Sequence, residues 1–129
     1  MPSLKRKFGD MGEKEAEAFL VGNGYKILER NFRIKNLGEL DIVAEKNGKL
    51  IFFEVKTRDA KHESSFPIGF SINERKRKNL KRIGQLYLIE RNIPQDLDWQ
   101  VDAIFVLVDL ERDSYRIEQL KNILWEKYY

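Results

Sequence analysis

Residues 38–57 read GELDIVAEKNGKLIFFEVKT, two runs of alternating side chains joined by Asn47-Gly48. An Asn-Gly pair between such runs is the strongest short-range signal of a β-hairpin, because both residues tolerate the positive φ angles of a two-residue turn. Counting outward from this turn places Asp41 directly opposite Glu54. The stretch therefore predicts two antiparallel strands in a defined register.

The two faces of this hairpin differ in character, because side chains alternate between the faces of a strand. One face is wholly apolar and is expected to be the core side: Leu40, Ile42, Ala44, Ile51, Phe53 and Val55. The other face places charged side chains among apolar ones and is expected to be partly covered: Glu39, Asp41, Glu54 and Lys56 beside Val43, Leu50 and Phe52. The same register puts Glu39 opposite Lys56.

The pair formed by Asp41 and Glu54 is unfavourable without a partner. Like charges that face each other destabilise a sheet, where a favourable cross-strand pair contributes about 0.2–1 kcal/mol. Partial burial makes an unpaired carboxylate more costly still. A hard cation removes these costs, since Mg²⁺ prefers oxygen ligands and often uses only one or two carboxylates. The register favours a Mg²⁺ or Mn²⁺ site here over the alternative, a ladder of weak surface salt bridges.

Lys56 follows Glu54 by two residues and lies beside the expected metal site. A lysine there can hold the attacking water, help to deprotonate it, or stabilise negative charge that develops on a phosphate. A bound metal would polarise the phosphate and lower the pKa of a bound water. These residue types together predict hydrolysis of phosphodiester bonds, with Asp41, Glu54 and Lys56 as catalytic residues and both acids as metal ligands.

The rest of the pattern predicts an α/β protein with a mixed central sheet flanked by helices, in the order α-β-β-β-α-β-β-α. A first helix ends at Asn23-Gly24, and a closing helix carries Leu120, Ile123 and Leu124. Between them we expect strands at 25–33, 38–45 and 49–57, a loop at 58–72, a helix at 73–92, a buried strand at 101–108 and an edge strand at 115–117. The length of 129 residues favours a single domain over 1–129.

The composition excludes several classes of protein. The chain has no cysteine and one histidine, which excludes thiolate catalysis, cysteine-bound zinc and a multi-histidine metal site. No apolar run approaches the roughly 20 residues that span a bilayer, and no secretory signal is recognisable. We therefore expect a cytoplasmic protein that has no contact with a membrane.

Positive charge is concentrated in residues 73–82, NERKRKNLKR, although the net charge is only +3. Such a patch suits nucleic acid. The residues expected to contact it are Arg58, Arg75, Lys76, Lys78 and Lys81. Two alternatives stay open, a solvated helix face and a docking surface for an acidic protein partner.

The hairpin resembles the active site of the PD-(D/E)XK nuclease superfamily, which has the restriction-endonuclease-like fold. In that pattern an acid on one strand precedes E-x-K on the next, and here Asp41 is followed by Glu54-Val55-Lys56. The G-E-x-D form at 38–41 is similar to archaeal Holliday-junction resolvases. Nearly the whole chain resembles the YraN family of small conserved bacterial proteins, through an ordered set: Gly12-Glu13, Gly24-Tyr25, Asn31, GELD, FEVK, Lys76, Tyr87-Leu88 and Asp102.

The resemblance implies a restriction-endonuclease-like core and a Mg²⁺-dependent endonuclease that cuts DNA, including branched or structured DNA. Resolvase relatives act as twofold dimers, which leaves a homodimer open. The alternative is a non-catalytic nucleic-acid-binding module that keeps the nuclease fold. Binding without cleavage, unaffected by removal of the metal, would distinguish this alternative.

Five further residues are candidates for roles in or beside the site, with Glu13 as a further catalytic residue and Glu39, Glu17 and Asp102 as possible support. Resolvase-like relatives bring an acid from the first helix, and Glu13 fits this role better than Glu17 because it borders the apolar stripe of the helix. Lys76 either reaches the site or extends its stem to solvent. Asp102 lies inside an apolar strand, where a structural role is favoured. Glu39 either binds the metal or pairs with Lys56.

Overall fold

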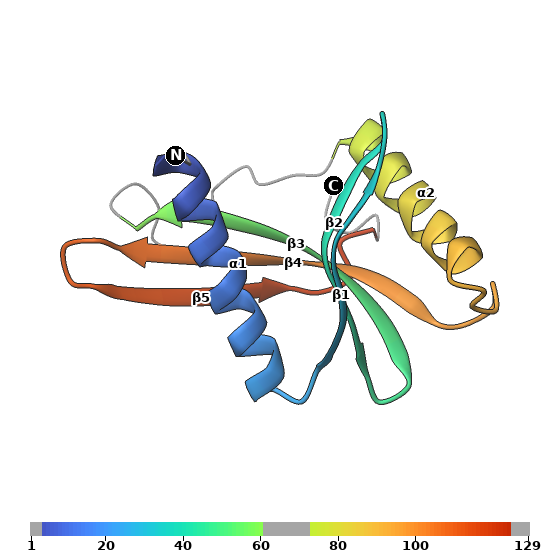
Figure 1. Cartoon of the computed structure of the whole chain (residues 1–129), viewed down its shortest axis with the longest axis horizontal. Helices are drawn as coiled ribbons and strands as arrows, with labels where there is room; N and C mark the ends of the chain where they lie inside the picture. Colours follow the sequence, from blue (N-terminus) through green and yellow to red (C-terminus); the bar gives the residue numbers. More distant parts are fainter. Residues whose placement is uncertain (1–3, 61–72, 125–129) are drawn as a thin grey trace.

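The structure of the chain, a computed structural model, describes residues 4–60 and 73–124, with side chains from residue 9 onward (Figure 1). The elements in order are α1 (Leu4–Gly22), β1 (Lys26–Ile34), β2 (Gly38–Lys46), β3 (Lys49–Asp59), α2 (Glu74–Glu90), β4 (Trp99–Asp109) and β5 (Ser114–Leu120). Neither helix combines the length and the apolar character that a membrane span requires, as far as the described residues go.

The strands form one mixed sheet in the order β1-β2-β3-β4-β5. Only the β3–β4 pair is parallel, and α2 lies in the connection between these two strands, as a parallel pair requires. The predicted α/β class, the mixed central sheet flanked by helices and the order of the first seven elements are confirmed. The predicted covered strand is β4, in which residues 101–108 are all buried.

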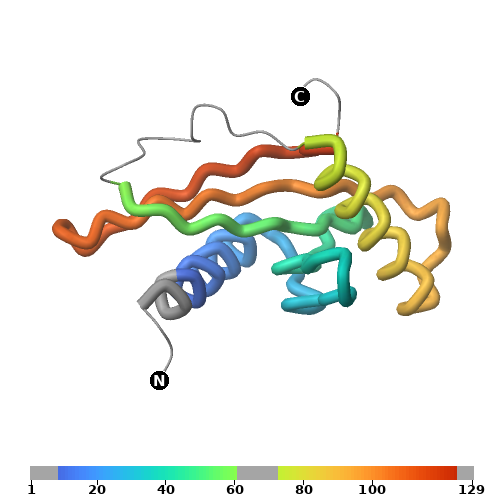
Figure 2. Tube along the Cα trace, turned by 90° about the horizontal axis from the view of Figure 1, so that it is seen from above, coloured from blue at the N-terminus to red at the C-terminus, as the bar shows by residue number. Residues whose placement is uncertain are grey.

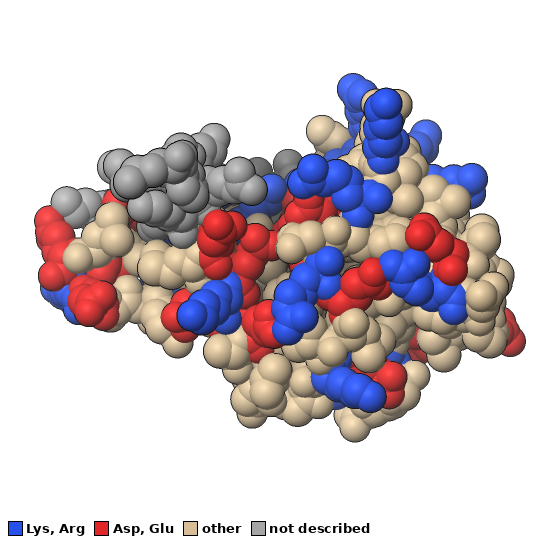
Figure 3. Space-filling view, viewed as in Figure 1, with Lys and Arg blue, Asp and Glu red and all other residues tan. Residues whose placement is uncertain are grey.

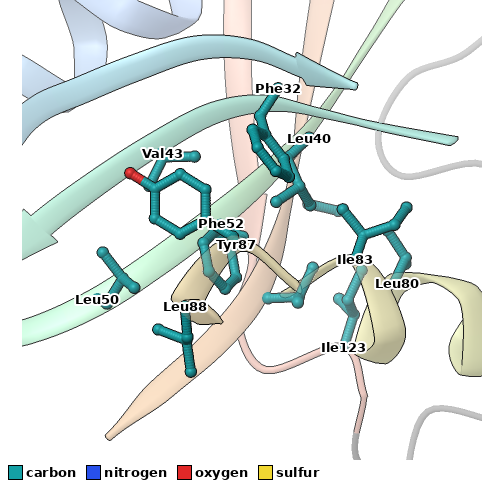
Figure 4. Close-up of a cluster of buried hydrophobic side chains, with 12 residues drawn as sticks. Phe32, Leu40, Val43, Leu50, Phe52, Leu80, Ile83, Tyr87, Leu88 and Ile123 are labelled. Atoms are coloured by element: carbon teal, nitrogen blue, oxygen red, sulfur yellow. The ribbon is translucent and has the colours of Figure 1, made fainter. Parts of the chain in front are cut away.

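The two helices cover opposite faces of the sheet and create two separate cores (Figures 1 and 2). Under α1, Ala16 and Leu20 pack on a set of strand residues that includes Ile42, Ala44, Ile51 and Phe53. Under α2, the ring of Tyr87 contacts Phe32 and Phe52, with centroid distances of 5.0 and 5.3 Å (Figure 4). The face that was expected to be partly covered is therefore fully buried at Val43, Leu50 and Phe52.

Glycines allow both helices to approach the sheet closely. A Cβ atom on Gly12 of α1 would lie 1.7 Å from Oγ1 of Thr57 on β3. A Cβ atom on Gly84 of α2 would lie 2.7 Å from the ring of Trp99 on β4. Since real Cβ atoms do not approach so closely, both contacts require glycine, and Gly12 fixes how near the following residue of α1 comes to β3.

The predicted register of the hairpin is confirmed from Lys46–Lys49 to Ile42–Phe53. The predicted facing of Leu40 is wrong, because this residue lies in the α2-side core with Phe32, its partner on β1. Two irregularities explain why strict alternation fails here. The β1–β2 ladder shifts register between Ile27 and Glu29, and Asn31 of β1 has φ 54°. Both bend the hairpin and increase its twist.

The predicted closing helix is wrong for the described residues. Leu120 is the last residue of β5, which pairs with β4 in antiparallel fashion over its whole length. After β5, the backbone N–H of Ile123 donates to the carbonyl of Val101 at 2.8 Å, and Leu124 lies in a turn. Backbone pairing to the open edge of β4 thus replaces the helix that the apolar spacing suggested, and residues 125–129 lie outside the described residues.

Candidate active site

A pocket of about 440 Å³ opens between β2, β3 and the first two turns of α2. Its walls include Asp41, Glu54 and Lys56, the three residues predicted to be catalytic, and also Arg75 and Lys76 of α2. The structure therefore brings together residues from the hairpin and from the basic helix. These two features were recognised separately in the sequence.

Asp41 is held in place by the backbone of the neighbouring strand. Its Oδ2 accepts a hydrogen bond of 2.7 Å from the N–H of Val55, just beyond the last ladder pair of β2 and β3. The pKa of Asp41 is raised to about 7, chiefly by burial; the bond from Val55 lowers it, and the nearby acids Glu39 and Glu13 raise it. The charged form of Asp41 is therefore unfavourable in free energy, and a bound cation would stabilise it.

Glu13 and Glu39 complete an acidic cluster around Asp41. The three residues offer carboxylate oxygens that all lie within 4.8 Å of one another. Glu13 reaches the cluster because Gly12, the preceding residue, lets α1 lie directly on β3. Burial, followed by the charges of Glu39 and Asp10, raises the pKa of Glu13. Three acids whose carboxylate oxygens lie this close form a suitable donor set for a hard cation.

Asn31 is a member of this site whose role sequence reasoning missed. It lies on β1 between the pairs Arg30–Ile42 and Phe32–Leu40, and so faces Asp41. In the amide orientation that satisfies its surroundings, its nitrogen donates to Glu39 at 3.2 Å and to Glu13 at 3.3 Å. The pairing of β1 with β2 was the signal that would have located it.

The helix acid that joins the cluster is Glu13 and not Glu17. Glu17 accepts a hydrogen bond of 2.7 Å from Nε of Arg30 on β1. This bond lowers the pKa of Glu17, outweighing its slight burial. Of the two roles left open for Glu39, pairing with Lys56 is wrong, since Glu39 pairs with Arg33, its direct neighbour on β1, at 2.5 Å. Its place in the acidic cluster leaves the role of metal ligand open.

Glu54 is compensated by two lysines. Its Oε1 accepts from Nζ of Lys76 at 2.5 Å and lies 3.0 Å from Nζ of Lys56. Burial alone would raise the pKa of Glu54, but the two lysines outweigh it and hold the pKa below its usual range. The second oxygen, Oε2, is buried and has no hydrogen-bond partner within residues 4–60 and 73–124.

The other predicted residues lie in three different places. Asp102 is fully buried and accepts bonds from the side chains of Gln100 and Gln119 and from the backbone of Asn122, which agrees with a structural role. Arg58 is exposed and donates to the carbonyl of Thr57 at 2.9 Å. Lys78 and Lys81 line a different pocket. The single histidine, His62, belongs to the loop predicted at 58–72 and lies outside the described residues.

The side chains of the site fit a divalent cation. Three carboxylates, those of Glu13, Glu39 and Asp41, offer oxygens within 4.8 Å of one another, and burial and the neighbouring acids raise the pKa of Asp41. Glu54 lines the same pocket as Asp41, and its buried Oε2 lacks a partner among the described residues. Oxygen-only donors suit Mg²⁺ or Mn²⁺ and do not suit zinc or copper. Glu13, Glu39 and Asp41 are the residues whose oxygens converge for such an ion. Glu54, the other predicted ligand, would reach it with Oε2, since its Oε1 is held by Lys56 and Lys76.

A mixed five-stranded sheet with carboxylates and a lysine on two adjacent central strands places the chain in the α/β class with a polar site at the middle of the sheet. The chain belongs to the uncharacterised protein family UPF0102, the YraN family, whose model matches residues 12–106.

Relatives in this family cover nearly the whole chain. A UPF0102 protein of Acetivibrio thermocellus is 36% identical over 122 residues, which cover 92% of this chain and 89% of the relative. A UPF0102 protein of Clostridium botulinum is 37% identical over 122 residues, which cover 95% of this chain and 97% of the relative.

Two solved structures are similar at low identity. Pyrococcus furiosus SfsA in complex with Ca²⁺ has a TM-score of 0.40 and 16% identity, covering 91% of this chain and 63% of that chain. The crystal structure of SSO0001 has a TM-score of 0.37 and 19% identity, covering 97% of this chain and 55% of that chain.

Proposed function

We propose that the protein is a metal-dependent endonuclease that hydrolyses phosphodiester bonds in DNA, with branched or otherwise structured DNA as its substrate class. The observation that carries this proposal is the arrangement of Asp41, Glu54 and Lys56 around one open pocket that also contains Arg75 and Lys76. Acids that suit a cation and basic side chains that suit a phosphate thus share the same cavity.

Each residue has a role that its position supports. Asp41 and Glu54 would hold Mg²⁺ or Mn²⁺, with Glu13 beside them. When bound, such an ion polarises the phosphate and lowers the pKa of a bound water. Lys56, on the strand of Glu54, orients the attacking water or stabilises the charge that grows on the phosphate oxygens. Arg75 and Lys76 hold the phosphate backbone at the wall formed by α2.

One observation favours the alternative of a non-catalytic nucleic-acid-binding module. Both lysines contact the same oxygen of Glu54, so this acid is already neutralised without a metal. A site that is stable in this form would bind nucleic acid and leave it uncut. The unpartnered Oε2 of Glu54 and the uncompensated Asp41 support the enzyme over this alternative.

The test is cleavage of junction, flap, duplex and single-stranded DNA in Mg²⁺, in Mn²⁺ and with EDTA. We expect metal-dependent cleavage that Asp41→Asn reduces by about a thousandfold, a loss of roughly 4 kcal/mol of transition-state stabilisation. The matched control is Glu45→Gln, which removes an exposed carboxylate from the same strand and should leave the rate within about twofold. Metal-independent binding of these DNAs without cleavage of any of them would establish the alternative instead.

A further inference from the structure

A second pocket, of about 380 Å³, lies along α2 and is separate from the acidic one. Its walls include Lys78 and Lys81 of α2, Trp99 at the start of β4, and Asn122 and Leu124 after β5. None of these residues belongs to the acidic pocket.

The two pockets lie on opposite flanks of the same helix. With 3.6 residues per turn, Lys76 and Asn79 project from one flank of α2, while Lys81 projects from the other. Between the flanks, the outer surface carries the exposed side chains of Arg75, Lys78 and Arg82. Lys and Arg atoms gather at the upper right of Figure 3, where the turn between β1 and β2 and the beginning of α2 overlap in the view. A basic path therefore connects the acidic pocket to the second pocket across the helix.

The second pocket carries more positive than negative charge, because Arg77, Lys78 and Lys81 line it together with one acid, Glu74. Arg77 pairs with Glu74 at 2.7 Å, whereas Lys78 and Lys81 form no ion pair within the described part of the chain. Two exposed lysines at a concave surface attract an anion, and phosphate groups are the usual anion of an extended ligand.

Trp99 gives this pocket a rigid aromatic wall. Its ring packs edge-on against Phe52, with a centroid distance of 5.3 Å, and its six-membered edge lies against the backbone of Gly84. The ring is partly exposed and lines the pocket. An aromatic ring that is already fixed, beside basic side chains, suits stacking of an unpaired base, because stacking needs a π face and tolerates any base.

We propose that the second pocket binds an unpaired nucleotide of the strand whose backbone enters the acidic pocket, with the base on Trp99 and the phosphates at Lys78 and Lys81. This inference rests on the proposed function for the identity of the ligand. An α-helix with its side chains is about 10 Å wide, so a strand that crosses α2 needs only a few nucleotides to join the two pockets. The substrate class is then DNA with a single-stranded segment next to the cleavage position.

The test measures binding with EDTA present, so that cleavage plays no part. The full chain carries Trp125→Phe, which leaves Trp99 as the only tryptophan. Oligothymidylates of increasing length are titrated against its fluorescence, beside an abasic oligonucleotide of equal length. We expect thymidylates long enough to cross α2 to quench Trp99, and the dinucleotide and the abasic strand to leave it unchanged.

A double variant tests the phosphate contacts. Lys78→Ala with Lys81→Ala should weaken binding of the long oligothymidylate by at least about tenfold and make its log–log salt dependence shallower by about 1.4, or 0.7 for each lysine on a single strand. The matched control, Lys26→Ala with Arg112→Ala, removes two exposed charges far from α2 and should change the affinity by about twofold or less.

The outcomes separate this inference from the proposed function. Equal weakening by the two double variants, or equal quenching by abasic and thymidylate strands, would overturn the nucleotide subsite even if DNA is cleaved. Quenching and selective weakening in a protein that never cuts DNA would support the subsite and refute the nuclease. Absence of any oligonucleotide binding would overturn both.

Discussion

The site has an acidic half, formed by Glu13, Glu39 and Asp41, and a lysine-held half, formed by Glu54, Lys56 and Lys76. Asp41 and Glu54 lie on adjacent strands and are both largely buried, yet their pKa values move in opposite directions, up to about 7 for Asp41 and below the usual range for Glu54. Burial penalises both charged forms. The neighbours decide the outcome, since Glu54 has two cations and Asp41 has two anions.

This difference shows that the fold compensates the charge of Glu54 with its own lysines and leaves the charge of Asp41 to be compensated by a ligand. The lysine-held half is stable without any ion. The acidic half is costly at neutral pH unless a cation binds or a proton is retained. Four predictions test this contrast between the acidic half and the lysine-held half.

The first prediction concerns the rate of DNA cleavage when the acidic half loses its helix acid. Glu13→Gln should lower the metal-dependent rate by about a hundredfold, because it removes a carboxylate beside the ion. Glu17→Gln should lower it by about twofold or less, since Glu17 is occupied by Arg30. Single-turnover cleavage at saturating Mg²⁺ measures both, and the reverse order would identify Glu17 as the helix acid.

The second prediction concerns the stability of the protein, which depends on the close contact of Gly12 in α1 with Thr57 in β3. Gly12→Ala should destabilise the protein by about 3 kcal/mol, because its Cβ would meet the Thr57 side chain at 1.7 Å and push α1, with Glu13, away from the site. Gly9→Ala provides the control in the same helix, since a Cβ there meets nothing within 4 Å and alanine favours the helix. Urea unfolding compares them, and equal midpoints would contradict the close approach.

Removing the acid of the lysine-held half should have a structural cost. Glu54→Gln keeps an oxygen that can accept from Lys56 and Lys76 but removes the negative charge that compensates them, and we expect the free energy of unfolding of the metal-free protein to fall by about 2 kcal/mol. The control is Glu74→Gln, which breaks an exposed pair with Arg77 and should cost about 0.5 kcal/mol or less. Thermal and urea unfolding in EDTA measure the difference, and an unchanged Glu54→Gln variant would show that the lysines do not stabilise this acid.

The acidic half should show the opposite response, as a dependence on pH. The pKa of Asp41 is raised from 3.8 to about 7 in the folded protein. The protonated Asp41 therefore contributes to the stability of the folded state fully below about pH 4, and this stabilisation is lost as the pH rises through 7. In EDTA, the free energy of unfolding of Asp41→Asn should therefore rise relative to that of the wild type between pH 5 and pH 8. The expected difference is on the order of 1 to 2 kcal/mol after allowance for solvent screening. The control is Asp96→Asn, which removes an exposed carboxylate and should show no such rise relative to the wild type. Parallel curves of unfolding free energy against pH for all three proteins would refute the contrast.

The sequence predicted the β2–β3 hairpin better than β1 and the segment that follows β4, for physical reasons. The Asn47-Gly48 turn fixes a register by itself, so the facing of Ile42 and Phe53 follows from counting. The facing of Leu40 does not follow, because bends at β1 depend on a neighbouring strand. The helix predicted at Leu120 and Ile123 failed because the open edge of β4 offered backbone partners that apolar spacing cannot reveal.

The site divides in the same way. Asp41, Glu54 and Lys56 are local to one hairpin and were predicted together. The pairing of Lys76 with Glu54 depends on how α2 docks, and the bond from Asn31 to Glu13 depends on β1 and α1 together. The second pocket was not foreseen, because Trp99 and Lys81 meet only when the β3–β4 crossover is complete.

The hairpin of β2 and β3 also bears on the order in which the site assembles. Contacts between residues near in sequence form with little loss of chain entropy, while distant contacts must wait for larger loops to close. The β2–β3 hairpin is such a local unit, whereas Gly12 meets Thr57, and Trp99 meets Phe52, across long stretches of chain. We therefore expect Val43 and Phe52 to have higher φ-values than Ala16 and Leu20. Two acids and a lysine would then be in place during folding before either helix arrives.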